Sequence, residues 1–241
     1  MKRTFLLLIV VLALTAGNVY AHDAGDLMLG IEPQIGIALP SVSLMSDYSM
    51  FPGIDFSLRM AFDYYLTDFL ALGTGIGYSG NFHFFVNDVN TEMIALFMVP
   101  VIGWLIAGIA ADSGASPVDI NGYYFASYVT VPFGIRFSGR VFTLGAGGTA
   151  NFPVYGSNDV YEFKLLPYLG WYGDIGFDLS GRKGRKNGFG MLFRLNGSIT
   201  KTAEPVTPPS EYFVSCGFFS TSLILKANIE LANLPIGGKK Q

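Results

Sequence analysis

The sequence is poor in the residues that build disulfides, metal sites and soluble surfaces. It has one cysteine, Cys216, and two histidines among 241 residues. One cysteine cannot form an internal disulfide, and so few nitrogen and sulfur ligands argue against a zinc site. Charged residues make up 14% of the chain and hydrophobic residues 51%, whereas about a quarter of the residues in a soluble domain are charged. We therefore expect no metal, no cofactor and no ordinary soluble fold.

The first 21 residues have the features of a secretory signal. Lys2 and Arg3 precede an uninterrupted apolar run over 5–14, and the residues up to Ala21 suit a signal peptidase. We predict that residues 1–21 are cleaved and that 22–241 form the mature domain. The alternative is an uncleaved anchor helix, for which the apolar run is short. Cleavage would remove two of the 15 basic residues and none of the 18 acidic ones, which leaves a net charge of −5 and gives no support to nucleic-acid binding.

Apolar residues alternate along the chain with small or polar ones. Between Leu27 and Leu39 the odd positions are almost all apolar, while the even positions include Gly30, Glu32 and Gln34. A period of two residues is typical of a strand with two different faces. Seven further stretches repeat the pattern, which predicts eight strands over residues 27–39, 54–64, 70–83, 123–137, 142–152, 163–179, 189–200 and 219–231.

The connections between these predicted strands differ in length. Those after the second, fourth and sixth strands are short, near Thr67, Gly139 and Lys183, and the others are generally longer. Short turns at one end and longer loops at the other are typical of outer-membrane barrels. We predict an all-β fold, an eight-stranded antiparallel up-and-down transmembrane β-barrel. The alternative is a soluble sandwich or lipocalin-like barrel, whose outward face would be the polar one.

One face of the predicted strands carries nearly all of the charge. In a barrel surrounded by lipid this face lines the lumen, where buried charges must be paired or solvated. Because eight strands leave little room for a channel, we favour a structural network over an ion-selective pore. The predicted lumenal charge network consists of Glu32, Asp55, Arg59, Asp63, Arg136, Lys164, Asp174, Asp178, Arg194, Lys226 and Glu230.

The most unusual segment is residues 93–111, which contain no charge and lie between the third and fourth predicted strands. A helix of that length could span a bilayer, but a crossing here would invert the pattern of short turns and long loops. We therefore place the segment in an external loop over 85–121, where so apolar a surface needs a cover. The alternatives are a loop packed on itself or on the membrane, and a hydrophobic lid or binding segment built on Met93, Phe97, Val101, Trp104 and Leu105.

Candidate catalytic residues are scarce. His83 and Ser79 fall on the predicted lumenal face of the third strand, near its external end. The sequence has no G-x-S-x-G elbow and no recognised Ser–His motif around them. A single histidine at a strand end is more often a polar rim residue, so we predict no catalytic site and no enzyme.

Two stretches carry a family resemblance. They are SYVTVPFGIRFSGRVFTLGAGGTANF at 127–152 and YYLTDFLALGTGIGYSG at 64–80, in which a strand ends at an aromatic, turns and returns through a Gly-rich strand. The chain resembles the small outer-membrane barrels of the OmpX, OmpW and PorT-like kind. The resemblance implies residence in the outer membrane of a diderm bacterium, contact with its lipid, and insertion by the barrel-insertion machinery.

The same resemblance implies two kinds of function. OmpW-like members are associated with the passage of small hydrophobic molecules, and other members with adhesion or envelope integrity. We therefore expect either a passive channel or transporter for a small hydrophobic ligand, or a structural or surface-interaction barrel, adhesin-like or antigen-like, with a closed lumen. Many paired lumenal charges would favour the second function, and the apolar loop would favour the first.

Overall fold

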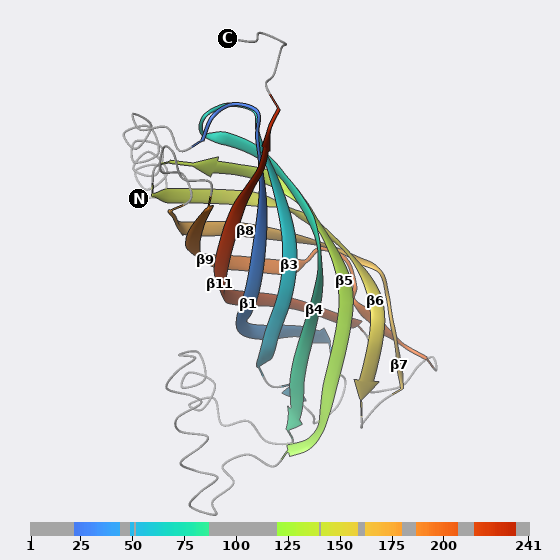
Figure 1. Ribbon diagram of the computed structural model, residues 1–241. Coiled ribbons are helices and arrows are strands. Elements are labelled where there is room, and N and C mark those ends of the chain that lie inside the picture. Colours follow the sequence, from blue (N-terminus) through green and yellow to red (C-terminus); the bar gives the residue numbers. More distant parts are fainter. Residues whose placement is uncertain are drawn as a thin grey trace, which may run out of the picture.

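The computed structural model describes residues 22–43, 49–50, 52–86, 120–139, 141–158, 162–179, 187–206 and 215–234. Strands dominate these ranges and wrap into a barrel (Figure 1). No helix in the described ranges is long and apolar enough to cross a membrane. The predicted signal over 1–21 and the apolar segment over 93–111 lie outside the described residues.

Eight strands form the barrel wall, and each pairs antiparallel with its neighbours in the order of the chain. The last of them pairs with the first, from Asp26↔Asn233 to Ser43↔Ser215, which closes the ring. The predicted eight-stranded antiparallel up-and-down barrel is therefore confirmed. The wall strands are β1 (Asp26–Ser43), β3 (Gly53–Tyr65), β4 (Leu70–Val86), β5 (Ile120–Ser138), β6 (Phe142–Asn158), β8 (Tyr168–Asp178), β9 (Asn187–Ser198) and β11 (Ser215–Asn233).

The two ends of the barrel differ. At one end, here called the turn end, residues 66–69, 139–141 and 179–186 connect successive strands, and β1 begins and β11 ends there. The opposite end is called the loop end. The 19 residues of β5 extend for about 63 Å at about 3.3 Å per residue. At a tilt of about 45° they rise about 44 Å, which exceeds a hydrocarbon core of about 30 Å. The strands can therefore cross a bilayer and project beyond it.

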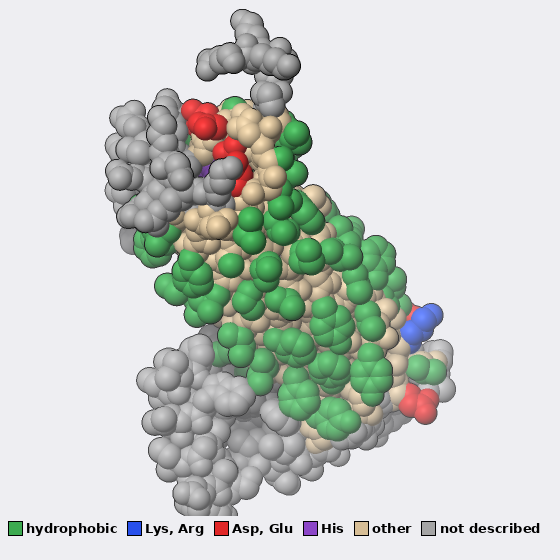
Figure 2. All heavy atoms as spheres, in the orientation of Figure 1, with side chains coloured by type: hydrophobic (Ala, Val, Ile, Leu, Met, Phe, Trp, Pro, Cys, Tyr) green, Lys and Arg blue, Asp and Glu red, His purple; other side chains and the backbone are tan. Residues whose placement is uncertain are grey.

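Side chains alternate between an apolar outer face and a polar inner face. In β3 the even positions from Ile54 to Tyr64 are more exposed than the odd positions from Gly53 to Tyr65. Figure 2 shows apolar side chains over the middle of the wall and charged ones only towards its ends. So broad an apolar surface suits lipid and not water, and the predicted orientation of the two faces is confirmed. Outward-facing examples are Ile35, Leu58, Ile76, Phe133, Phe193 and Leu223.

Three short strands, β2 (Ser49–Met50), β7 (Phe163–Leu165) and β10 (Ala203–Pro205), add to the loop end. β7 pairs with β10, and β10 pairs with β11 through Ala203 and Cys216. The prediction of one continuous strand over 163–179 is therefore wrong, because the chain leaves the ladder at Leu166 and Pro167 before β8 begins. Pro167 has no N–H to donate, which disfavours a continuous ladder at this point.

Candidate functional site in the barrel lumen

A cluster of ion pairs fills the lumen towards the turn end. Arg194 meets Asp174 twice, with Nε 2.6 Å from Oδ1 and Nη2 2.6 Å from Oδ2, a bidentate geometry that is among the strongest between side chains. Arg136 donates to Asp63 and, over 3.2 Å, to Glu32. The charges are shared, because the Nη2 atom of Arg194 also lies 3.6 Å from a carboxylate oxygen of Glu32.

Lys226 completes this cluster from the last strand. Its Nζ donates to Asp63 over 2.7 Å and lies 3.6 Å from Glu32 and 3.9 Å from Asp178. The cluster thus joins side chains of β1, β3, β5, β8, β9 and β11, six of the eight wall strands. All its members are buried, and their pairing offsets the cost of removing charge from water. We call Glu32, Asp63, Arg136, Asp174, Asp178, Arg194 and Lys226 the charge cluster.

The turn end is covered by residues that precede β1. His22 stacks on Tyr65 with ring centroids 3.9 Å apart, and its Nδ1 lies 4.0 Å from Asp26. Burial lowers the pKa of His22 below its ordinary value of 6.5, against the opposite influence of Asp178, Asp26, Asp63 and Asp23. Below the cluster, Asn228 donates to Asp178 over 2.8 Å. The lumen is therefore filled from the cluster down to the turn end.

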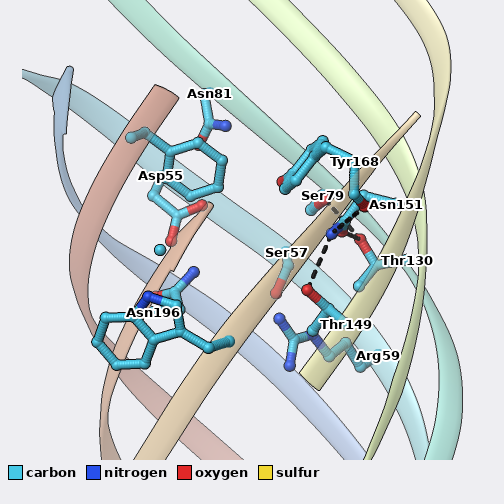
Figure 3. A pocket seen from close by; sticks show the side chains of 13 residues that line it. Asp55, Ser57, Arg59, Ser79, Asn81, Thr130, Thr149, Asn151, Tyr168 and Asn196 are labelled. Atoms are coloured by element: carbon cyan, nitrogen blue, oxygen red, sulfur yellow. Dashed lines mark hydrogen bonds between the residues drawn. The ribbon is translucent and has the colours of Figure 1, made fainter. Parts of the chain in front are cut away.

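Above the charge cluster, towards the loop end, lies a small polar cavity of about 20 Å³ (Figure 3). A volume of this size holds one or two water-sized guests. Most lining hydroxyls and amides bond to one another: Ser79 pairs with Thr130 at 2.8 Å, Thr130 donates to Asn151, and Asn151 donates to Thr149. The lining residues are Asp55, Ser57, Arg59, Ser79, Asn81, Thr130, Thr149, Asn151, Tyr168, Trp171, Asn196, Gly197 and Phe218.

Two charged residues line this cavity, and they are held differently. The Oδ2 atom of Asp55 accepts hydrogen bonds from Gln34 over 2.8 Å and from Ser220 and Ser222 over 2.9 Å each. Arg59 is 4% exposed, yet its Nε and Nη1 atoms have no hydrogen-bond partner among the described residues. The cavity therefore contains a well-held carboxylate and a buried guanidinium whose donors are largely unused.

An aromatic cluster caps the lumen at the loop end. Tyr128 and Tyr168 meet edge to face, with ring centroids 4.9 Å apart, a favourable geometry for two aromatic rings. Tyr124 packs on Phe163 of β7 at 4.9 Å, and the Tyr128 hydroxyl donates to the Thr202 carbonyl over 3.3 Å. Buried Ala126 and the side chains of Leu165 and Phe218 complete the cluster. Among the described residues, aromatic surface therefore lies nearer the loop end and polar surface lies below it.

Beside this aromatic cluster, the described ladder of the wall is interrupted. β6 pairs with β8 in constant register from Phe142↔Phe177 to Asn151↔Tyr168, and there the pairing between these two strands stops although β6 continues to Asn158. The next positions in that register would be 152 with 167 and 153 with 166, and each contains a proline, which cannot donate to a ladder. We call this boundary between residues 152–158 of β6 and β7 the seam.

Side chains, and not backbone hydrogen bonds, cover the seam in the described residues. A Cβ placed on Gly156 would lie 3.0 Å from Cγ of Leu165 and 3.2 Å from Cζ of Phe163, so both side chains of β7 press against β6. On the outer face, Phe152, Val154 and Tyr155 are more than half exposed. The seam therefore has an aromatic lumen on one side and exposed apolar side chains on the other.

The structure brings together most of the predicted lumenal residues. Nine of the eleven are buried inside the barrel, and seven of these form the charge cluster while Asp55 and Arg59 line the cavity. Lys164 is a correction: it is exposed on β7, opposite Glu204, because the break at Pro167 takes it out of the alternation of β8. Glu230 is partly exposed near the turn end, opposite Met28, and lies outside the ion pairs.

Several further site features have no clear signal in the sequence pattern. Gln34 donates to Asp55 in the cavity, and the aromatic cluster lies above it. The sequence does not identify either feature, because a glutamine or a tyrosine on an alternating strand is no sign of a cavity. Of the considered catalytic residues, His83 is buried and Ser79 pairs with Thr130. Met93, Phe97, Val101, Trp104 and Leu105 lie outside the described residues. Within the described ranges no group of three or more metal-binding side chains is present.

Comparisons of structure identify similar known proteins, whereas comparisons of sequence do not. No protein family and no curated protein matches the sequence. The outer membrane protein OprG from Pseudomonas aeruginosa has a TM-score of 0.51 at 12% identity, over 89% of this chain and 99% of that chain. Neisserial surface protein A has a TM-score of 0.41 at 10% identity, over 85% of this chain and 97% of that one. The likeness to OprG shows that this chain has the fold of the small outer-membrane β-barrels.

Proposed function

We propose that this chain is a bacterial outer-membrane barrel that passes small hydrophobic molecules sideways from its loop end into the membrane. The observation that carries the proposal is the seam, where the described ladder stops at Asn151 and Tyr168 beside the aromatic cluster. The apolar outer wall supports residence in lipid. Insertion by the barrel-insertion machinery stays a prediction.

The charge cluster argues against a route straight through the barrel. A hydrophobic solute crossing the lumen would have to separate Arg194 from Asp174, which are joined by two hydrogen bonds of 2.6 Å. Breaking a buried pair is strongly unfavourable, because it leaves uncompensated charge in a place of low dielectric. An apolar solute offers no replacement hydrogen bonds. Passage therefore has to leave the lumen above the cluster.

The seam offers such an exit. Opening an ordinary part of the wall would break backbone hydrogen bonds that lipid cannot replace. Opening the seam requires only that Phe163 and Leu165 move away from Gly156, which leaves apolar groups in contact with apolar solute or lipid. We further propose that the predicted segment over 93–111, through Met93, Phe97, Val101, Trp104 and Leu105, covers the loop end as a hydrophobic lid.

A reversible covalent lock tests the route. Gly156 and Leu165 are replaced by cysteine in a Cys216→Ser background. The Cβ position at 156 lies 3.0 Å from Cγ of Leu165, close to the spacing that a disulfide bridges. In liposomes with the refolded barrel, we expect oxidation to slow uptake of a small apolar fluorophore such as naphthalene at least about fivefold, and reduction to restore it.

The control lock joins Phe193 and Leu223, which are paired across β9 and β11 in an intact part of the ladder. Replacing both with cysteine and oxidising them should leave uptake unchanged. If the seam lock also has no effect although mass spectrometry shows that the disulfide has formed, the lateral route is wrong.

The second candidate is a structural or surface-interaction barrel with a closed lumen, and the charge cluster is the specific observation in its favour. The two candidates differ in one measurement on the unlocked protein. Both should be silent to ions in a planar bilayer, but only the transporter should accelerate naphthalene uptake over protein-free liposomes. A barrel without that acceleration is a structural or surface-interaction protein.

A further inference from the structure

The guanidinium of Arg59 differs from the other lumenal cations. Arg136, Arg194 and Lys226 each contact at least two carboxylates in the charge cluster. Arg59 forms no ion pair with the described residues, and two of its nitrogen atoms have no hydrogen-bond partner there although the side chain is only 4% exposed. Glu32, Asp174 and Asp55 attract this guanidinium only from beyond ion-pair distance, and buried donors without an acceptor are unfavourable in a folded protein. The unused donors call for an acceptor that the described residues do not supply.

Asp55, the carboxylate that lines this cavity, already has hydrogen-bond partners of its own. Asp55 accepts three hydrogen bonds on Oδ2, from Gln34, Ser220 and Ser222, so neutral donors hold this carboxylate in place and it offers no acceptor atom to Nε or Nη1 of Arg59 within hydrogen-bond distance. The other carboxylates of the lumen are shared among the cations of the charge cluster. The donors of Arg59 are therefore the part of the cavity without a counterpart.

We propose that the cavity binds a small monovalent anion, the size of chloride, on the guanidinium of Arg59. Arginine has five N–H donors and no acceptor, so only an electron-rich guest can satisfy it. The cavity of about 20 Å³ limits that guest to one or two water-sized groups. Thr149 lines the same space (Figure 3), and since its oxygen accepts from Asn151, its O–H can be donated to the guest. The carboxamide Oδ1 of Asn81, also without a partner, can accept from a water that hydrates the anion.

This site does not depend on the lateral route. It lies in the lumen above the charge cluster, and its role is to provide an acceptor for the guanidinium donors that the described residues leave unused. Chloride in the medium would then stabilise the folded barrel by mass action, because only the folded chain forms the site. The effect would depend on the size of the anion and not on ionic strength alone.

Thermal unfolding of the refolded barrel tests the site. Sodium chloride is compared with sodium gluconate at equal ionic strength, since gluconate is too large for the cavity. We expect the unfolding midpoint to rise by about 3 °C with chloride at about ten times its dissociation constant. Arg59→Gln should abolish the difference between the two salts. Lys164→Gln, which removes an exposed cation outside the lumen, should leave it unchanged.

Three results would overturn the proposal: equal midpoints in both salts for the unsubstituted protein, a chloride response that survives in Arg59→Gln, or one that Lys164→Gln also removes. Heat-dependent migration in gels checks that each variant is folded. If Arg59→Gln does not fold, crystals of the unsubstituted protein grown in bromide give the answer. An anomalous peak at the guanidinium of Arg59 supports the site, and its absence at a bromide concentration that stabilises the protein refutes it.

Discussion

The two halves of the lumen hold their buried charged and polar side chains in different ways. Towards the turn end, seven charged side chains satisfy one another, and β6 pairs with β8 without a break. Towards the loop end, Arg59 has unused donors, the lining is polar but neutral apart from Asp55, and the described ladder stops at the seam. From this difference we expect stability to be concentrated in the first half of the lumen. The proposed anion site and the proposed lateral route both lie in the second half.

The largest expected effect compares one cation from each half. Arg194→Met removes both short hydrogen bonds to Asp174, which then has only Arg136 at 3.9 Å, and it removes one of the three cations around Glu32. We expect this change to destabilise the barrel by about 3–5 kcal/mol, as the loss of one partner of a buried pair does. Arg59→Met, in chloride-free medium, removes no ion pair within 4 Å but does remove the longer-range attraction to Glu32, Asp174 and Asp55, so its cost should be clearly smaller than that of Arg194→Met. Urea unfolding in lipid vesicles measures both. Equal losses for the two variants would mean that the halves do not differ in this way.

A double variant sharpens that comparison. Replacing Asp174 with Asn together with Arg194→Met removes most of the uncompensated charge. We expect the loss of the double variant to be clearly smaller than the sum of the two single losses, because contacting residues are not additive. Additive losses would indicate that the pair contributes little beyond the volume of its side chains.

A smaller effect concerns the boundary between the halves, where two glycines make room for a tyrosine. A Cβ on Gly147 would lie 2.2 Å from the carbonyl oxygen of Phe133 and 2.8 Å from the hydroxyl of Tyr172. The Tyr172 ring in turn lies 4.7 Å from the guanidinium carbon of Arg194. We expect Gly147→Ala to cost about 1–3 kcal/mol, as overpacking does.

The matched control is Gly173→Ala on the neighbouring strand. Nothing lies within 4 Å of a Cβ placed there, so its unfolding free energy should change by less than about 0.5 kcal/mol. Urea unfolding midpoints decide between them, and equal losses would contradict the crowding described at Gly147.

The smallest effect is the pH dependence at the turn end. Burial lowers the pKa of His22 below 6.5, so the unfolded chain binds its proton more readily than the folded one. The contribution of neutral His22 to stability is therefore fully present above pH 6.5 and declines as the pH falls towards the folded pKa. Unfolding midpoints from pH 8 to pH 5 should decrease, and His22→Gln should decrease less. An equal decrease in both would assign the pH dependence to other groups.

Much of the fold was predictable from the sequence because a strand has a strict period. Once Glu32 and Gln34 were placed on the same face, the alternation placed the apolar residues between them outside, and the short turns indicated the order of strands. The same rule failed at Lys164, because a period of two is valid only while the strand is continuous, and Pro167 interrupts it. Prolines at 153 and 167 carried that signal in the sequence.

The partners inside the lumen could not be predicted. Alternation says that Arg59 and Arg194 face inward, but the stagger of the strands decides which carboxylates they reach. Arg194 lies opposite Asp174 in the ladder and pairs with it, whereas Arg59 lies opposite Glu32 and does not. The length and direction of the side chains make that difference, and a one-dimensional pattern does not contain it. The closed charge cluster was foreseen as a network, and the cavity was not foreseen.

The composition of the charge cluster also has a consequence for how the barrel forms. Lys226 on the last strand meets Asp63 on the second wall strand, 163 residues away, and Arg136 meets Glu32 across 104 residues. Such distant contacts form late, since the intervening chain must first be ordered. Until β11 docks on β1, Lys226 cannot reach Asp63 and Glu32, and we expect these carboxylates to remain more hydrated than in the closed barrel. Arg136 and Arg194 can meet the same carboxylates earlier, so we expect the contribution of Lys226 to the charge cluster to arise together with closure of the ring.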